Sequence, residues 1–277
     1  MSNFTRRFVY LLTLAALTNA LHAVDGVILI DQARAMAGNV TPGDTPGFPI
    51  LITVPGSYRL SANLTIPDRF TNGIQITADN VTIDLNGFSI IGPTVCTPNP
   101  TNCGGSGGGV GIHSGDFNTG TIHARNIRVY NGTVRGMGFH GVRLMGDTSL
   151  VENVFTYSNG GPGIVVGGGS VINSFAVLNG GTGIIAAQSY NSVADRNAST
   201  GISIRQSGIA IGNRSTFNGG AGLTIFTGTA ANNTVTNNGG FGIDATCPAV
   251  LTANVSIANS GGNYRFTGSC TILSNTP

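Results

Sequence analysis

The stretch GIVVGGGSVINSFAVLNGGTGIIA, residues 163–186, contains one full repeat of the chain and the start of the next. It begins with Gly, a branched residue, a variable residue and another apolar one, and this pattern returns 20 residues later. Copies begin, at intervals of 22, 20, 18, 21 and 20 residues, at Gly141, Gly163, Gly183, Gly201, Gly222 and Gly242. Earlier copies at 73 and 111 are further apart, which indicates inserted loops. Repeats this short cannot bury their own apolar side, so the pattern predicts a stack of similar coils.

Asparagine recurs in step with the repeat glycine. One column stands about ten residues before it and comprises Asn131, Asn153, Asn173, Asn191, Asn213, Asn232 and Asn254. A second column comprises Asn159, Asn179, Asn197, Asn218 and Asn238. In a stack, equivalent Asn side chains can hydrogen-bond from coil to coil, and Asn tolerates left-handed turns. We therefore expect an asparagine ladder, with Gly supplying the remaining corners of positive φ.

The composition excludes several other classes of protein. The 277 residues include 43 Gly and 28 Asn but one Glu and no Lys, so the best solvated helix formers are nearly missing. The 40% of apolar residues excludes a disordered chain, and the lack of a Gly-X-Y period excludes collagen. An all-β fold remains. Branched residues such as Ile164 and Val166 would point inward, and each strand would pair in parallel with its neighbours about 4.8 Å away.

These features resemble the right-handed parallel β-helix proteins of the pectin-lyase-like superfamily, and the likeness covers residues 25–270. The segment GIQITADNVTIDLNGFSIIG at 73–92, preceded by PGSYRLSANLTI, is similar to the opening coils of exported bacterial members. The resemblance implies a single-stranded right-handed parallel β-helix, for which we expect eight or nine coils of about 20 residues. It also implies a short N-terminal capping helix, here Asp31–Gly38, with Asp as N-cap and Gly as the terminating residue.

The first 23 residues have the pattern of a signal peptide. Arg6 and Arg7 precede an apolar run at 8–17, and Ala20 and Ala23 provide small residues for cleavage. The run is about ten residues long, short of the roughly twenty needed to span a bilayer. We therefore expect a secreted, periplasmic or cell-surface protein whose mature chain has no transmembrane span. Its β-helix domain would occupy 24–277, with a cap and first strands at 25–60, a loop insertion at 93–110 and a C-terminal coil and cap at 242–277.

Charge and cysteine content narrow the partners and the compartment. Removing residues 1–23 leaves 11 Arg (13 − 2) against 11 acidic residues, which argues against nucleic acid as a partner. An even number of Cys, four, is typical of an oxidising compartment. Of the three possible disulfide arrangements, the simplest pairs cysteines that are close in the sequence: Cys96 with Cys103, and Cys247 with Cys270. A zinc site is the alternative. Cys247 and Cys270 are 23 residues apart, about one coil, so stacking would bring their Cα atoms to about 5 Å.

The outward residue of each repeat strand should form a column along one face of the stack. That column reads Gln75, His113, Arg143, Val165, Ile185, Ser203, Thr224 and Asp244. Around its first half, residues 111–152 gather unusual side chains: His113, His123, His140, Arg125, Arg128, Arg135, Arg143, Asp116, Asp147 and Glu152, the sole Glu. We therefore predict that a functional site lies in the window 111–152. The apolar pair Val165 and Ile185 would lie beneath a loop, for which the insertion at 93–110 is a candidate.

The resemblance implies two kinds of chemistry for such a site. Superfamily lyases use a basic residue to remove a proton next to a carboxylate, often with Ca²⁺, whereas the hydrolases use clustered Asp. In the lyase mechanism Arg143 or His113 would be the base, and Arg128 or Arg135 would hold the substrate carboxylate. The paired carboxylates that hydrolysis needs are not visible in the sequence.

Further residues of the window are candidates for binding. Substrate contacts are expected from His123, Arg125, His140, Tyr130 and Tyr157, the two Tyr partly replacing the missing Trp. No cofactor is certain, and the candidates for a Ca²⁺ site are Asp116, Asp147 and Glu152, which only folding could bring together.

Two interpretations of function stay open. In the first, an exported protein engages an extracellular polysaccharide, a uronate-rich one being favoured; whether it is an enzyme stays open, with lyase-type elimination favoured over hydrolysis. In the second, the protein is a noncatalytic structural or adhesive surface protein for which the regular stack is itself the function. The Arg and His side chains of the window would then form an ordinary solvated face.

Overall fold

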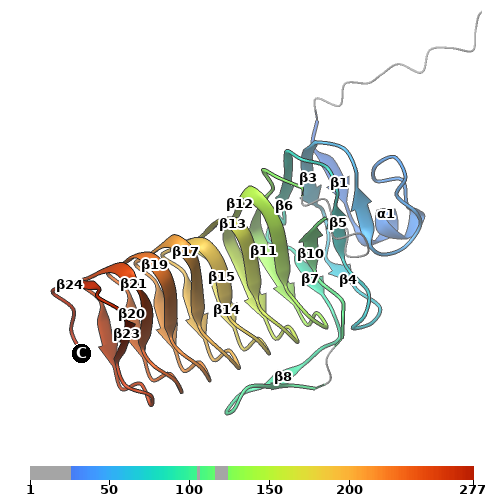
Figure 1. Ribbon diagram of the computed structural model, residues 1–277. Helices are drawn as coiled ribbons and strands as arrows, with labels where there is room; N and C mark the ends of the chain where they lie inside the picture. Colours follow the sequence, from blue (N-terminus) through green and yellow to red (C-terminus); the bar gives the residue numbers. More distant parts are fainter. Residues whose placement is uncertain (1–25, 105–106, 116–123) are drawn as a thin grey trace, which may run out of the picture.

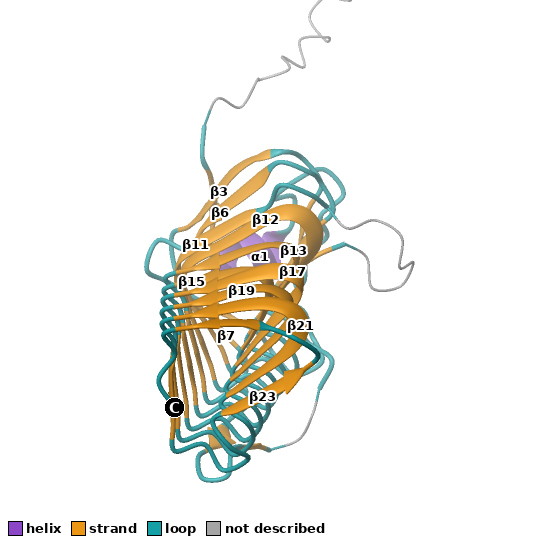
Figure 2. Cartoon of the chain, turned by 60° about the vertical axis from the view of Figure 1, so that its left-hand side comes forward, coloured by secondary structure: helices purple, strands orange, loops and turns teal. Residues whose placement is uncertain are grey.

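The computed structural model describes residues 26–104, 107–115 and 124–277, so the predicted signal peptide lies outside the described residues. The chain winds into a stack of coils that runs in sequence order from the N-terminal to the C-terminal end (Figure 1). Strands of successive coils lie over one another, and the turns between them form continuous rows (Figure 2). Each full coil crosses three sheets, which we name faces A, B and C in the order in which the chain passes through them after each repeat glycine.

Face A is built from the repeat strands. They are β2 (Ile50–Ile52), β5 (Ile74–Ile76), β10 (Ile112–Ser114) and the first parts of β12 (Val142–Tyr157), β13 (Ile164–Ile172), β15 (Ile184–Tyr190), β17 (Ile202–Ile211), β19 (Leu223–Ala231) and β21 (Ile243–Thr252), followed by β23 (Tyr264–Thr267). These are ten parallel strands within the described residues, so the stack has about ten coils, slightly more than predicted. The strands Ile50–Ile52 and Tyr264–Thr267 lack the repeat motif, which is why the sequence pattern omits them.

Faces B and C complete each coil. Face B contains β1 (Ile28–Ile30), β3 (Gly56–Leu60), β6 (Val81–Asp84), the start of β11 (Arg128–Arg135), the middle of β12, the second parts of β13, β15, β17, β19 and β21, and β24 (Thr271–Leu273). Face C contains β4 (Leu64–Thr65), β7 (Ser89–Ile91), the ends of β11 and β12, β14 (Phe175–Val177), β16 (Val193–Asp195), β18 (Arg214–Thr216), β20 (Thr234–Thr236) and β22 (Val255–Ile257). All these pairings are parallel, as the repeat predicts.

The core fills the inside of the coils with side chains from alternate strand positions. In face A, Ile164, Val166, Ile184 and Ala186 are completely buried and stack on their counterparts in the next coil. The same inward alternation continues on the other faces, for example at Val171. A period of two in a short apolar segment therefore places one side of every strand in the core.

The repeat glycines are required for space. A Cβ added to Gly183 would lie 2.6 Å from Nδ2 of Asn197 and 2.7 Å from the carbonyl oxygen of Gly201, and the φ of Gly183 is not positive. The expectation that Gly mainly supplies positive-φ corners is therefore wrong for this column. Many left-handed positions are instead held by residues with side chains, such as Asn173 with a φ of 47°.

Replacing Gly183 by Ala is expected to lower the free energy of unfolding by about 1–3 kcal/mol, because the new methyl group must displace backbone and a buried amide. Urea unfolding followed by circular dichroism measures this change. Gly108→Ala is the matched control, since a Cβ there meets nothing within 4 Å and its φ is not positive. Equal midpoints for the two variants would contradict the packing explanation.

An asparagine ladder runs along the corner between faces C and A. The Nδ2 of each Asn donates to the Oδ1 of the next at 2.9–3.0 Å through Asn159, Asn179, Asn197, Asn218, Asn238 and Asn259. Each receiving Oδ1 also accepts the backbone N–H of the preceding Asn. The second asparagine column of the sequence therefore forms a buried ladder, as expected.

The first asparagine column has a mixed role at the corner between faces B and C. Its ladder runs through Ser174, Ser192, Asn213, Asn233, Asn254 and Asn275. Only Asn213 and Asn254 of the predicted column are members of it. The others stand one position earlier, where φ is 47–60°: Asn131, Asn153, Asn173, Asn191 and Asn232. At this corner, a residue with left-handed backbone geometry comes directly before the ladder residue. Asn suits both positions, so the sequence pattern alone does not separate the two columns.

Both ends of the stack carry the expected caps. Helix α1 (Gln32–Ala37) follows Asp31, whose side chain accepts a hydrogen bond from the N–H of Arg34, and it ends at Gly38 with a φ of 71°. Near the other end, Cys247 and Cys270 form a disulfide with Cα atoms 5.0 Å apart. Cys96 and Cys103 form the second disulfide, so the zinc alternative is wrong. No helix within the described ranges is long and apolar enough to cross a membrane.

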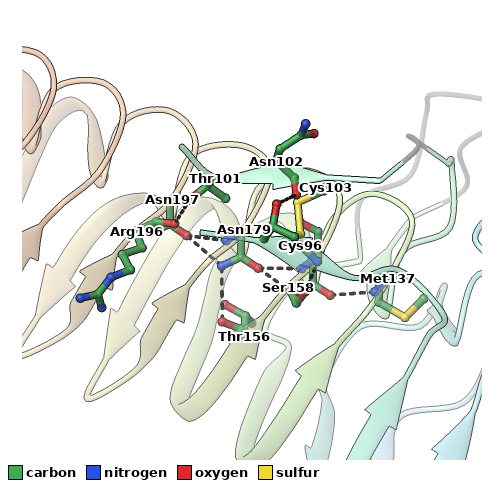
Figure 3. The surroundings of a disulfide bond; sticks show 12 residues. Cys96, Thr101, Asn102, Cys103, Met137, Thr156, Ser158, Asn179, Arg196 and Asn197 are labelled. Atoms are coloured by element: carbon green, nitrogen blue, oxygen red, sulfur yellow. Dashed lines mark hydrogen bonds between the residues drawn. A yellow bond between two sulfur atoms is a disulfide. The ribbon is translucent and has the colours of Figure 1, made fainter. Parts of the chain in front are cut away.

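The insertion at 93–110 leaves the stack as a disulfide-closed hairpin of β8 (Cys96–Thr97) and β9 (Asn102–Cys103). The hairpin lies over the corner between faces C and A (Figure 3), where the N–H of Cys96 donates to Ser158 Oγ at 2.6 Å and Thr101 Oγ1 donates to the carbonyl of Arg196 at 2.6 Å. It therefore crosses the asparagine corner, and the expectation that this insertion covers Val165 and Ile185 on face A is wrong for its hairpin.

Candidate functional site

The predicted outward column forms along face A. Strand register places His113 beside Gln75 and Arg143, and Arg143 beside Val165. The column continues without interruption through Ile185, Ser203, Thr224 and Asp244, and it ends at Arg265, which pairs with Asp244. Residues about 20 positions apart in sequence are thus direct neighbours in space.

Basic side chains gather at the N-terminal half of this column. His113 is almost fully buried, and Arg143 is half-buried. Burial lowers the pKa of Arg143, and the positive charge of Arg205, two coils beyond its neighbour Val165, lowers that pKa further. His140, in the turn before Gly141, is buried, and burial together with the charge of Arg143 lowers its pKa to about 4, against an opposing hydrogen bond to the backbone of Pro162. His140 is therefore neutral at pH 7.

An open groove of about 790 Å³ lies on face A, in the coils that follow Arg143. Its floor contains Ile185 and Ser203, and Arg205 and Phe226 stand at its C-terminal side. The hollow exists because the equivalent outward positions of the preceding coils carry almost no side chain: Gly167, Gly168 and Ala187. We call this feature the face A groove. It runs over several coils, so an extended chain fits it better than a compact ligand does.

Asp147 is the acidic residue at the edge of the groove. It pairs in register with Gly168, and a Cβ added to Gly168 would lie 2.5 Å from its Oδ1. The carboxylate is exposed and stands where the chain bends from face A to face B. Of the predicted site residues, His113 and Arg143 are register neighbours on face A, the charge of Arg143 reaches His140, and Asp147 borders the groove at Gly168.

Sequence reasoning missed two residues of the groove, Arg205 and Phe226. Both lie two positions after the outward column, beyond the four-residue repeat motif, and Phe226 is 51% exposed. A signal was available, because an exposed Phe and a lone Arg follow repeats in which Gly or Ala holds the same place.

Other predicted site residues lie on different faces. Arg128 points outward on face B, where it pairs with Glu152 at 2.6 Å and lies 4.5 Å from the ring centre of Tyr130. Arg135 and Tyr157 are register partners on face C. Arg128 and Arg135, predicted to hold the substrate carboxylate, therefore lie on faces B and C, whereas Arg143 lies on face A. Each coil of about 20 residues passes through all three faces, so residues that are close in the sequence lie on different faces.

The remaining candidates are Arg125, His123, Asp116 and Glu152, and the structure describes two of them. Arg125 stands at the turn before face B, where its N–H donates to Asp79 at 2.7 Å, and its side chain is exposed. His123 and Asp116 lie outside the described residues. Among the residues that the structure describes, no three His, Cys, Asp or Glu side chains come together to hold a metal ion. Asp147 borders the groove and Glu152 is paired on face B, so these two do not assemble the predicted Ca²⁺ site.

Face C carries an exposed aromatic cluster of Phe155, Tyr157 and Phe175. The ring centres of Phe155 and Tyr157 are 6.0 Å apart, and those of Phe155 and Phe175 are 6.1 Å apart. Tyr157, a predicted substrate contact, therefore belongs to this cluster and is separated from the face A groove.

Comparison with known proteins locates the fold. No family model matches the chain, and no curated protein matches it in sequence. Among solved structures, the A-module of the Azotobacter vinelandii mannuronan C-5 epimerase AlgE6 has a TM-score of 0.54 and 18% identity, over 76% of this chain and 62% of that one. The Dettilon tailspike protein has a TM-score of 0.53 and 13% identity, over 82% and 50%. A double mutant of the periplasmic alginate epimerase AlgG has a TM-score of 0.52 and 12% identity, over 81% and 70%.

The chain spans less than two thirds of the first two of these structures. Identities of 12–18% establish a shared fold and leave the activity of this chain to be argued from its own residues. With about ten parallel coils, two asparagine-containing ladders and these neighbours, the chain has the pectin-lyase-like parallel β-helix fold.

Proposed function

We propose that the protein binds an acidic polysaccharide along the face A groove. The observation that carries this proposal is the pair Arg143 and Arg205: Arg205 lines the groove, and its charge lowers the pKa of Arg143 on the same face. Guanidinium groups pair with carboxylates through two parallel hydrogen bonds, and partial burial strengthens such contacts. Phe226 and Ile185 offer apolar surface to the faces of sugar rings.

Two further observations support this proposal. The names of two structural neighbours state that they are epimerases of mannuronan and alginate, both acidic polysaccharides. The two disulfides fit an exported protein, because such bonds persist in oxidising compartments. We therefore place the protein outside the cytoplasm, where it meets such polymers.

If the bound chain reacts, elimination suits the groove better than hydrolysis. The reaction removes a proton from the carbon next to the carboxylate and breaks the bond between the neighbouring carbon and the glycosidic oxygen. A double bond forms between the two carbons, and the departing oxygen takes a proton from water to become a hydroxyl group. Arg143 has a lowered pKa and is partly exposed on face A, so its side chain is placed to receive the proton, whereas His113 beside it is 1% exposed. Hydrolysis requires two carboxylates that converge on one bond, and the described residues that line the groove include no Asp or Glu.

Binding is tested by measuring the affinity of the protein for uronate-rich and neutral polysaccharides at low and high salt. Arg143→Ala and Arg205→Ala are each expected to weaken binding of the acidic polymer about tenfold or more, since hydrogen bonds to charged groups contribute about 1.5–3 kcal/mol. Added salt should weaken it as well. The control is Arg214→Ala, which removes an exposed arginine from face C. Loss of affinity in all three variants, or in none, contradicts the proposed site.

Reaction is tested separately by incubating the protein with the same polysaccharides, with and without Ca²⁺. New reducing ends with ultraviolet absorbance indicate a lyase, and new ends without it indicate a hydrolase. Binding without new ends would favour the noncatalytic, adhesive interpretation. The exposed aromatic cluster on face C favours that interpretation too, because it gives the stack a second surface for contact.

A further inference from the structure

A second concave site lies at the corner between faces C and A, close to the N-terminal end of the stack. It is an open pocket of about 330 Å³. Its walls come from the turn after β4 and from the segment after β7, through Pro67, Asp68, Arg69, Phe70, Pro93 and Thr94. We call it the corner pocket. The face A groove uses residues 167–246 instead, so the two sites share no residue.

One wall of the pocket contains a buried hydroxyl group without a partner. Thr94 is 7% exposed, and its Oγ1 has no hydrogen-bond partner among the residues that the structure describes. Its backbone is held, because its N–H donates to the carbonyl of Gly136 at 2.7 Å. A buried hydroxyl with no partner destabilises a fold, and Thr94 Oγ1 is closed to solvent, so this group is a local weak point behind the pocket wall.

The opposite wall presents an aromatic ring. Phe70 is 66% exposed, and Arg69 lies 5.4 Å from its ring centre. The turn that carries both is rigid: Asp68 Oδ1 accepts hydrogen bonds from the N–H groups of Phe70 and Thr71 at 2.7 and 2.9 Å. The carbonyl of Arg69 also accepts the N–H of Gly109 at 2.9 Å. An exposed Phe fixed in this way is a prepared stacking surface.

We propose that the corner pocket binds one pyranose sugar ring. The apolar face of the sugar would stack on Phe70 and contact the rings of Pro67 and Pro93. Asp68 and Arg69 offer an acceptor and a donor at the rim for further hydroxyl groups. The pocket volume is at the lower end of the range for small-molecule sites, which matches a single ring. This proposal does not depend on the function of the face A groove.

The test measures binding of free monosaccharides, neutral hexoses and uronic acids, to the whole protein by saturation-transfer NMR and titration. At least one sugar is expected to bind, and Phe70→Ala should weaken its affinity tenfold or more. Phe217→Ala is the matched control, because Phe217 is 51% exposed and carries Arg196 at 5.1 Å from its ring centre in the same manner. No binding by any sugar in the panel, or equal loss in both Phe variants, would overturn the proposal.

Thr94→Val supplies a second, independent readout. Valine keeps the shape and removes the hydroxyl without a partner, so we expect a higher urea midpoint and an unchanged affinity for the sugar. A weaker affinity in this variant, with Phe70→Ala without effect, would overturn the proposed stacking on Phe70. Neutral hexoses lack the carboxylate that Arg143 and Arg205 would bind, so their binding reports on the corner pocket alone and separates failure of this proposal from failure of the polysaccharide proposal.

Discussion

Replacing Asn197 by Ala is expected to lower the free energy of unfolding by about 3–5 kcal/mol. The Oδ1 of Asn197 accepts both the N–H and the Nδ2 of Asn179, and its own Nδ2 donates to the carbonyl of Ala176 and to Asn218. Alanine leaves the N–H of Asn179 and the carbonyl of Ala176 without these partners. Asn197 is 1% exposed and Asn179 is fully buried, so water does not replace the lost amide. Each unsatisfied buried group costs about 1–3 kcal/mol, and the cavity adds to this.

Urea unfolding of wild type and variant, followed by circular dichroism, measures the effect. Asn102→Ala is the control, because the side chain of Asn102 is exposed on the hairpin outside the ladder. Asn197→Asp should be at least as harmful, since it keeps the oxygens but removes the Nδ2 donor and buries a charge. A loss below about 1 kcal/mol for Asn197→Ala would show that the ladder contributes little to stability.

The fold could be predicted from the sequence because the spacing of the repeated residues gives the length of one coil. Ile164 and Ile184 are equivalent residues 20 positions apart, and register places them side by side. The same logic predicted the disulfide between Cys247 and Cys270, which are one coil apart. The number of coils was underestimated because the first and last strands of face A pair through their backbones without carrying the motif.

The candidate site could be predicted only in part, because its residues come from different turns of the stack. His113 and Arg143 were found since both occupy the second position after a repeat glycine. Arg128 and Arg135 were assigned to the site because they are close to Arg143 in the sequence. Each coil changes direction three times, so residues close in the sequence lie on different faces. The groove exists because Gly167 has no side chain and Ala187 has only a methyl group. Such a hollow can be recognised only when the equivalent positions of the stacked coils are compared.

Acid is expected to destabilise the protein through His140, by about 2–3 kcal/mol between about pH 7.5 and about pH 4.5. The pKa of His140 is lowered to about 4 in the folded protein, from 6.5 in the unfolded chain. Above about pH 6.5 both states are neutral at this residue, so it has no effect there. As the pH falls from about 6.5 towards 4, the unfolded chain takes up the proton and the folded protein does not, so stability is lost; below about pH 4 the loss is complete.

Comparison of wild type with His140→Gln isolates this contribution, because all other titrating groups are common to both. The variant should lose about 2–3 kcal/mol less than wild type in urea unfolding over the same pH interval, and parallel curves would contradict the assignment. NMR titration of His140 gives its pKa directly and connects it to the face A groove. Since the charge of Arg143 helps to lower this pKa, Arg143→Ala should raise it. A polysaccharide carboxylate bound at Arg143 would offset the same charge, so acidic polymer should raise the pKa of His140 while neutral polymer leaves it unchanged.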